Sequence, residues 1–113
     1  MGVSLMNAAT GVERGRRIVL GGRLDARGAT AARAELHAAV LAGAGDLVID
    51  MSDVESVDAV GLGVLVGTRR LAFRHGRTLL LEGCPPGVAR VLRAAGLHEL
   101  FTGGGPGRRV GAT

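Results

Sequence analysis

Three short, uninterrupted runs of aliphatic residues constrain the fold of this 113-residue chain more than any other feature: Ile18–Leu20, Leu47–Ile49 and Leu79–Leu81. Runs this short and this apolar are typical of strands in a sheet that helices cover. Apolar residues at helical spacing follow the runs, as at residues 29–40 and 88–95. The alternation of strands and helices predicts an α/β domain in which helices pack on a mixed sheet.

Glycines and prolines indicate where these elements begin and end. We expect one domain over residues 16–101. Residues 1–15 precede it with an edge strand at 3–6, and residues 102–113 follow it as a disordered, glycine-rich tail. The second helix should be mostly buried in its first half. The predicted strands are 16–21, 47–49 and 78–81, and an acidic loop is predicted at 50–57. The first predicted helix begins at 24–25 and ends at 43, the second runs from 58 to 75, and the third begins at 86.

The arginines give the chain a net charge of +4, which raises the question of nucleic-acid binding. They are spread along the whole chain, and two Phe with no Trp or Tyr provide no platform on which bases could stack. We therefore expect no nucleic-acid partner. The densest group of arginines is interpreted as a solvated helix face: Arg69, Arg70, Arg74 and Arg77.

The sequence also bears on the compartment of the protein. No apolar run approaches the length needed to span a bilayer, and the N-terminus lacks the pattern of a signal peptide. The single cysteine, Cys84, excludes an internal disulfide and is interpreted as a small residue at a strand end. We expect a cytoplasmic protein without direct membrane insertion.

Catalysis, metal binding and cofactor binding are not expected. His37, His75 and His98 have no ligand spacing and no evident acid or nucleophile beside them. The acidic residues between 50 and 58 match no calcium loop. They are interpreted either as a negative patch for an arginine-bearing partner or as a solvated loop.

The segment from Asp58 to Gly63 is the strongest candidate for a binding site. Asp58 should cap the second helix by accepting an N–H bond from Val60 or Gly61. Gly61 and Gly63 each cost about 1 kcal/mol relative to alanine inside a helix, so close packing or a close partner should offset them. Leu62 is either an exposed apolar anchor or part of the core.

Four patches in order resemble the STAS domain, and within it the anti-sigma factor antagonists. The resemblance covers residues 16–101 and implies a single small α/β domain, with a mixed sheet of about four strands flanked by three to four helices. The patches are Gly22–Asp25, Leu47–Val54, Asp58–Leu65 and the closing segment from Gly83 to Phe101.

The resemblance implies a partner-switching role. In this family the antagonist binds an anti-sigma factor that is also a serine kinase, and this releases a sigma factor. Phosphorylation of the first serine of the switch breaks the complex. Here Ala59 stands at that phosphoacceptor position and Val60 replaces the second serine, so the usual switch should not operate. Arg23 stands where the family often has an acid, which could change charge matching with the partner. Control could instead have moved to Ser52 or Ser56, or be absent.

We expect the partner to bind the first half of the second helix and the loop before it. A second reading is an accessory STAS subunit of an ABC-type membrane transporter, docking to its ATPase. A third is a sensor or scaffold subunit, and a weak homodimer is left open. The expected partner-binding residues are Asp25, Ser56, Asp58, Ala59, Val60, Gly61, Leu62 and Gly63.

Overall fold

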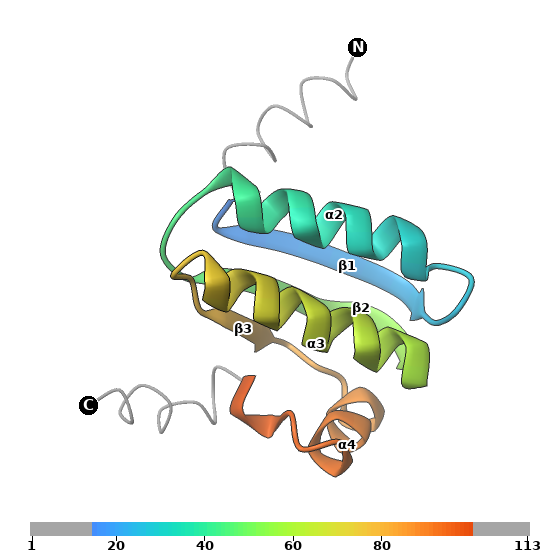
Figure 1. Cartoon of the computed structure of the whole chain (residues 1–113). Coiled ribbons are helices and arrows are strands. Elements are labelled where there is room, and N and C mark those ends of the chain that lie inside the picture. The colour runs from blue at the N-terminus through green and yellow to red at the C-terminus, as the bar shows by residue number, and fades with distance from the viewer. Residues whose placement is uncertain (1–14, 101–113) are drawn as a thin grey trace.

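The structure, a computed structural model, describes residues 15–100 and contains one parallel sheet with the strand order β1-β2-β3 (Figure 1). Helices α2 and α3 connect successive strands, and α4 and the short 3-10 helix η1 follow β3. In chain order the elements are β1 (Arg17–Leu24), α2 (Ala29–Ala42), β2 (Leu47–Val57), α3 (Ala59–Arg74), β3 (Leu79–Glu82), α4 (Pro86–Ala94) and η1 (His98–Leu100).

The prediction of a mixed sheet with about four strands is wrong for the part of the chain that the structure describes. Residues 15–100 contain three strands, and both pairings are parallel. A helix returns the chain across the sheet after β1 and after β2, so each new strand runs in the same direction as the last. The edge strand expected at 3–6 and the tail expected at 102–113 lie outside the described residues.

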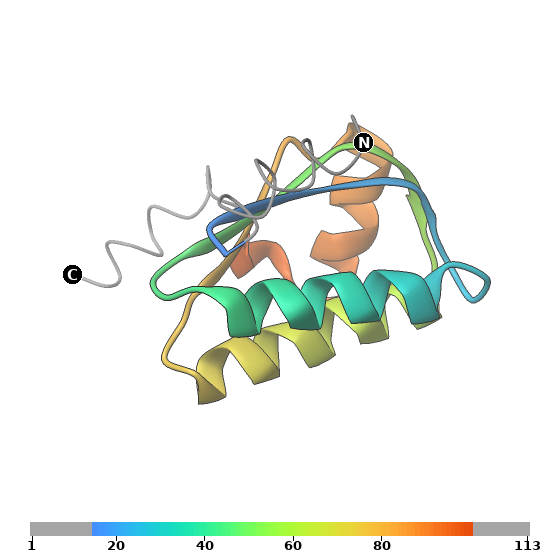
Figure 2. The same ribbon diagram turned by 90° about the horizontal axis from the view of Figure 1, so that it is seen from above.

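Helices α2 and α3 lie side by side on the same face of the sheet (Figure 2). The apolar face predicted for α2 is confirmed: Leu36, Ala39 and Val40 are buried, and the alanines of its first turn pack against the core. From α3, Val64, Leu65 and Ala72 complete this aliphatic layer. The core thus holds both helices against the strands.

Strand β2 extends to Val57, so the loop predicted at residues 50–57 is wrong. Strand β1 likewise extends to Leu24 and α2 begins at Ala29, so the helix start predicted at 24–25 is wrong. The buried residues in the second half of β2 are Met51, Val54 and Val57, one in every three rather than every second residue. The pairing of β1 with β2 shifts register twice here, and Gly22 adopts a φ of 75°. These irregularities hide the strand from any search for strict alternation.

Helix α4 begins as predicted, with Pro85 at the N-cap and Pro86 in the first turn. It lies beyond the short strand β3 and packs beside β2 (Figure 1). Gly96, at φ 79°, follows its C-terminus. Leu97 and Leu100 are buried, so this segment folds back onto the core.

Arg77 is buried between α3 and β3, so its assignment to a solvated helix face is wrong. Its guanidinium donates to the carbonyl oxygens of Ala39 at 2.9 Å, Val40 at 2.7 Å and Gly45 at 2.9 Å, and also to that of Gly15. Two of these carbonyls belong to the last turn of α2, where no following residue would bond them. Arg77 therefore ties the end of α2 to the chain on either side of the first crossover.

Candidate functional site

The carboxyl ends of β1 and β2 meet the first turn of α3. Leu24 is the register partner of Val57, and the Asp58 amide donates to the Leu24 carbonyl oxygen at 3.2 Å. This contact brings the loop at Asp25 to the same end of the sheet as the 56–63 segment. The sheet edge therefore gathers the two segments that the sequence singled out.

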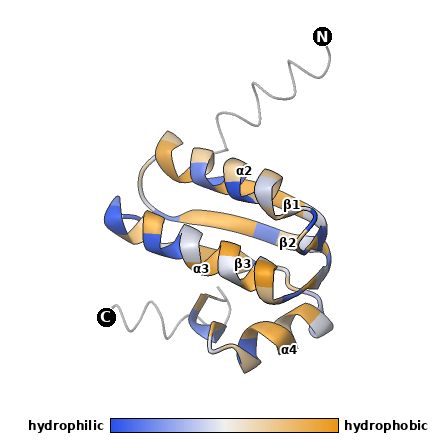
Figure 3. Cartoon of the chain, turned by 45° about the vertical axis from the view of Figure 1, so that its right-hand side comes forward, coloured by the Kyte–Doolittle hydropathy of each residue, from blue (hydrophilic) through white to orange (hydrophobic). Residues whose placement is uncertain are grey.

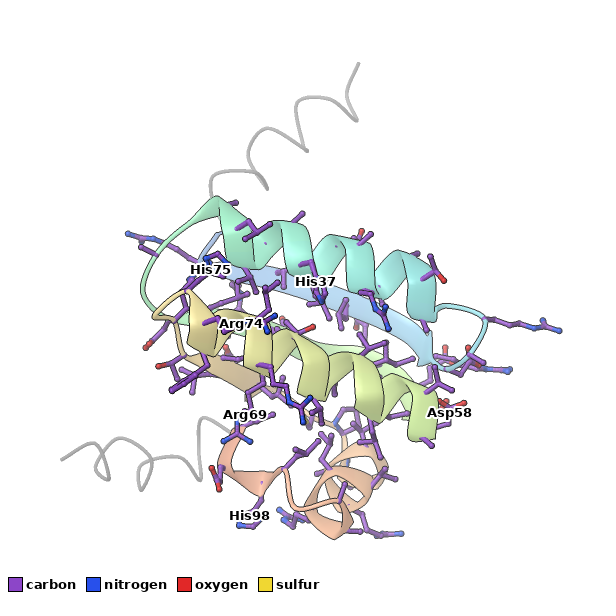
Figure 4. All side chains as sticks on the ribbon, in the orientation of Figure 1. His37, Asp58, Arg69, Arg74, His75 and His98 are labelled. Carbon is purple, nitrogen blue, oxygen red and sulfur yellow. The ribbon has the colours of Figure 1, made fainter. Side chains whose placement is uncertain are left out.

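Asp58 caps α3 as predicted. Its backbone is extended, with φ −109° and ψ −171°, and its Oδ1 atom accepts from the Gly61 amide at 2.9 Å. The side chain lies at the opposite end of α3 from Arg74 and His75 (Figure 4). The cap satisfies one of the free amides of the first turn and places a negative charge at the positive end of the helix dipole.

Gly61 allows the close approach that the sequence indicated. A Cβ atom at this position would overlap the Leu24 carbonyl group, so β1 is the neighbour that requires glycine here. Gly63 differs: a Cβ there would meet nothing within 4 Å, and the residue is exposed. The packing of residues 15–100 therefore explains the first glycine and leaves the second on the surface.

The first turn of α3 presents a small, apolar surface to solvent. Ala59 is exposed, and Val60 retains 45% of its accessible surface. The sequence left open whether Leu62 is an exposed anchor or part of the core. The side chain is half-buried and packs against the core, so it serves partly as a core residue. The expectation of a mostly buried first half therefore holds for one side of the helix, and the other side is available to a partner.

Asp25 and Ser56 flank this surface in different ways. The Asp25 carboxylate accepts from the amides of Arg27 at 3.0 Å and Gly28 at 3.2 Å, so it shapes the turn that leads into α2. Ser56 is exposed near the end of β2 and is the register partner of Arg23, which is also exposed. The two segments thus surround the start of α3 with one acid, one hydroxyl and one guanidinium.

Ser52 lies apart from the start of α3, roughly 20 Å of extended chain before Asp58. Its hydroxyl donates to the Asp50 carboxylate, which also pairs with Arg17 at 3.0 Å. Arg17 in turn contacts Glu82 at 2.7 Å. The hydrogen bonds from Ser52, together with the charge of Arg17, lower the pKa of Asp50. Asp50 thus belongs to an ion-pair network across the sheet.

The remaining acidic residues of this segment, Asp53 and Glu55, are exposed on β2. No three His, Cys, Asp or Glu side chains among residues 15–100 are grouped so that they could hold a metal ion. Within the same residues, no helix combines the length and the apolar character that crossing a membrane requires.

Cys84 is half-buried just beyond β3, and burial raises the pKa of its thiol to about 11. A thiol with so high a pKa is rarely ionised at neutral pH and is a poor nucleophile. The histidines are dispersed over α2, the end of α3 and η1 (Figure 4).

Two helices cover one face of a small parallel sheet, and the capped start of α3 lies at the carboxyl edge of that sheet. This arrangement defines the protein as a small α/β domain. The chain belongs to the STAS domain family: the family described as "Mlab, STAS domain" matches residues 8–102. It is 32% identical over 85 residues to the anti-sigma-B factor antagonist of Bacillus subtilis (strain 168), a match covering 75% of this chain and 77% of that protein.

Solved structures share the fold at lower identity. The anti-sigma factor antagonist SpoIIAA in its unphosphorylated form superposes with a TM-score of 0.66 at 20% identity, covering 85% of this chain and 90% of that one. A sulfate transporter family protein from Wolinella succinogenes superposes with a TM-score of 0.62, also at 20% identity, covering 75% and 70%. These similarities confirm the expected STAS-like α/β fold.

Proposed function

We propose that this protein is an anti-sigma factor antagonist that binds its anti-sigma factor through the first half of α3 and so frees a sigma factor. The observation that carries the proposal is the exposed, small and apolar first turn of α3, held at the sheet edge by the Asp58 cap. The identity to the Bacillus antagonist over three quarters of the chain supports the same role. Of the expected binding residues, Ala59, Val60 and Gly63 would touch the partner directly.

Ala59 would keep this surface permanently in a state that resembles the unphosphorylated one. A phosphate on a residue in this position adds a charge of about −1.5 to −2 and three acceptor oxygens. The positive end of a helix dipole tolerates such a group, so the fold would survive it. A closely fitted apolar interface would not, because the charge would be desolvated without a partner. Alanine carries no hydroxyl, so binding at this site would be independent of phosphorylation at residue 59.

The partner would be an anti-sigma factor of the serine kinase type, as the family resemblance implies. The exposed Asp58 carboxylate could accept from an arginine or hydroxyl of that partner while keeping its cap. Ser56 is the hydroxyl residue nearest to Ala59 in the sequence, so phosphorylation there would be the route by which control returns. Phosphopeptide mapping after incubation with the captured kinase tests this, and the absence of label on residues 52–56 would exclude it.

A pull-down from lysate of the native host tests the function. The baits are the wild type, Ala59→Glu, and the control Ala38→Glu, which makes the same change at an exposed position on α2. The proposal predicts that wild type and control capture a kinase-like anti-sigma factor and that Ala59→Glu does not. Capture of the same partner by all three would place the interface elsewhere.

The alternative of an accessory transporter subunit stays open, because a protein of the sulfate transporter family shares the fold as well. The same pull-down separates the two readings. Capture of a transporter ATPase by wild type, and of no anti-sigma factor, would replace the antagonist proposal with that of an accessory transporter subunit.

A further inference from the structure

The C-terminal half of α3 borders a groove that the proposed function does not use. The groove has a volume of about 1550 Å³ and lies between α3, β3 and η1. Its apolar lining includes Val66, Leu79 and Leu100. Along α3 the lining residues recur at helical spacing from Val66 to Phe73, so they share one side of the helix. Phe73 lies roughly 20 Å along the helix from Ala59.

The rim of this groove is strongly basic. Arg70 and Arg74 are exposed on α3, and Arg69 reaches across to pair with Glu99 of η1 at 2.9 Å. Glu99 is the one acid among the described residues that line the groove, against four arginines besides the buried Arg77. Figure 3 shows hydrophilic residues alternating with hydrophobic ones in the C-terminal half of α3. The groove therefore attracts negative charge.

Phe73 gives the basic rim an apolar contact point. It is 81% exposed, the highest value among the large hydrophobic residues of the described chain. A single exposed apolar side chain needs no explanation by itself. Phe73, however, lies between arginines at the edge of an apolar groove, and aromatic residues together with arginine dominate the energetics of protein interfaces.

The size of the groove favours a polypeptide over a small molecule. Pockets for small ligands usually hold about 300–1,000 Å³ and enclose most of the ligand. This groove is larger and is not enclosed, like the grooves that accept an amphipathic helix. We propose that it docks an acidic amphipathic segment of a partner protein. Carboxylates of that segment would pair with Arg70 and Arg74, and its apolar face would cover Phe73 and the groove floor.

This surface is separate from the start of α3. The protein would therefore bind an acidic segment at one end of the helix while the other end remains open to the partner proposed above. The two contacts can be tested separately, because an assay with a peptide contains no anti-sigma factor.

The probe is a fluorescein-labelled synthetic peptide of 18 residues (on the order of five helical turns) with leucines on one helical face and glutamates on the other. Its anisotropy is followed as the full-length protein is added at low salt. We expect saturable micromolar binding that weakens as salt rises. The double variant Arg70→Glu/Arg74→Glu and the single variant Phe73→Ser should each lose at least tenfold in affinity. Every changed residue is exposed, and thermal melts of each variant confirm that it folds.

The matched control is Arg27→Glu/Arg33→Glu, which reverses the same amount of charge at exposed positions outside the groove. It should bind the peptide like wild type, and so should Ala59→Glu. The proposal is overturned if the peptide does not bind, or if the control pair loses as much affinity as the groove pair. It is also overturned if phosphatidylglycerol vesicles or RNA bind with the same sensitivity to the groove variants and the peptide does not.

Discussion

The carbonyl group of Leu24 fills the space into which a side chain at position 61 would project. A Cβ atom on Gly61 would lie 2.9 Å from the carbonyl carbon of Leu24 and 3.0 Å from the Cγ atom of the Leu24 side chain. It would lie closer still to the Leu24 carbonyl oxygen. The same carbonyl oxygen accepts the hydrogen bond from the Asp58 amide. The end of β1 thus fixes the position of the first turn of α3, and with it the candidate binding surface.

Replacing Gly61 with alanine should therefore destabilise the protein. Alanine is favoured over glycine by about 1 kcal/mol in helix propensity. Overpacking against a backbone group, however, costs more than overpacking against a flexible side chain, because the backbone cannot move aside. We expect a net loss of about 2 kcal/mol in the free energy of unfolding, measured by urea denaturation. Gly63→Ala is the control: its Cβ meets nothing within 4 Å, so stability should rise by up to about 1 kcal/mol. Equal effects at both positions would contradict this account.

Removal of the Asp58 cap should cost about 1 kcal/mol of stability in Asp58→Ala, and Asp58→Asn should cost much less because asparagine caps equally well. The bond lost is that from the Gly61 amide to Oδ1. Thermal denaturation of both variants measures the difference. If Asp58→Ala lowers partner affinity far more than it lowers stability, Asp58 also contacts the partner. If the affinity is unchanged, the role of Asp58 is limited to capping α3.

Arg77 should be among the most sensitive positions outside the apolar core. Arg77→Met leaves the carbonyls of Ala39 and Val40 without their guanidinium donor, and it should lower the free energy of unfolding by about 3 kcal/mol. Arg74→Met, at an exposed position on α3, should change it by less than about 0.5 kcal/mol. Urea denaturation of the two variants tests this prediction. An equally small loss in the free energy of unfolding for both variants would show that Arg77 does not hold the end of α2 in place.

Cys84 should react slowly with thiol reagents. Because its pKa is raised to about 11, the thiolate is a minor species at pH 8. We expect labelling by a disulfide reagent to be on the order of a hundredfold slower than for a free cysteine of ordinary pKa. The rate should rise with pH well beyond pH 9, and denaturant should restore fast labelling. Rapid reaction of the folded protein at pH 8 would show an accessible, ionised thiol instead.

The sequence predicted well those features that depend on neighbouring residues. The aliphatic runs identified three strands, and an aspartate directly before an apolar helical segment identified Asp58 as the helix cap. It failed where the deciding contact comes from a distant segment. The second half of β2 is a strand because it pairs with β1 through shifted register, and the burial of one residue in three does not resemble a strand pattern.

The same limit applies to Gly61 and Arg77. The glycine was expected to permit a close approach, but only the fold identifies Leu24 as the neighbour. Arg77 was grouped with the arginines of α3 because charge near a helix usually faces water. Its burial follows from carbonyls at the end of α2 that no sequence pattern marks. The groove at Phe73 likewise exists only once β3 and η1 lie beside α3.

The central claim is that the anti-sigma factor binds over Ala59. It is tested most directly by isothermal titration calorimetry of the captured, purified partner against wild type, Ala59→Glu and Ala38→Glu. Glutamate in the first turn of a helix favours the dipole, so Ala59→Glu should remain folded. Burying its unpaired charge costs about 3 kcal/mol or more, so its Kd should rise at least about a hundredfold. Ala38→Glu should match wild type. A Kd for Ala59→Glu equal to that of wild type would contradict the claim.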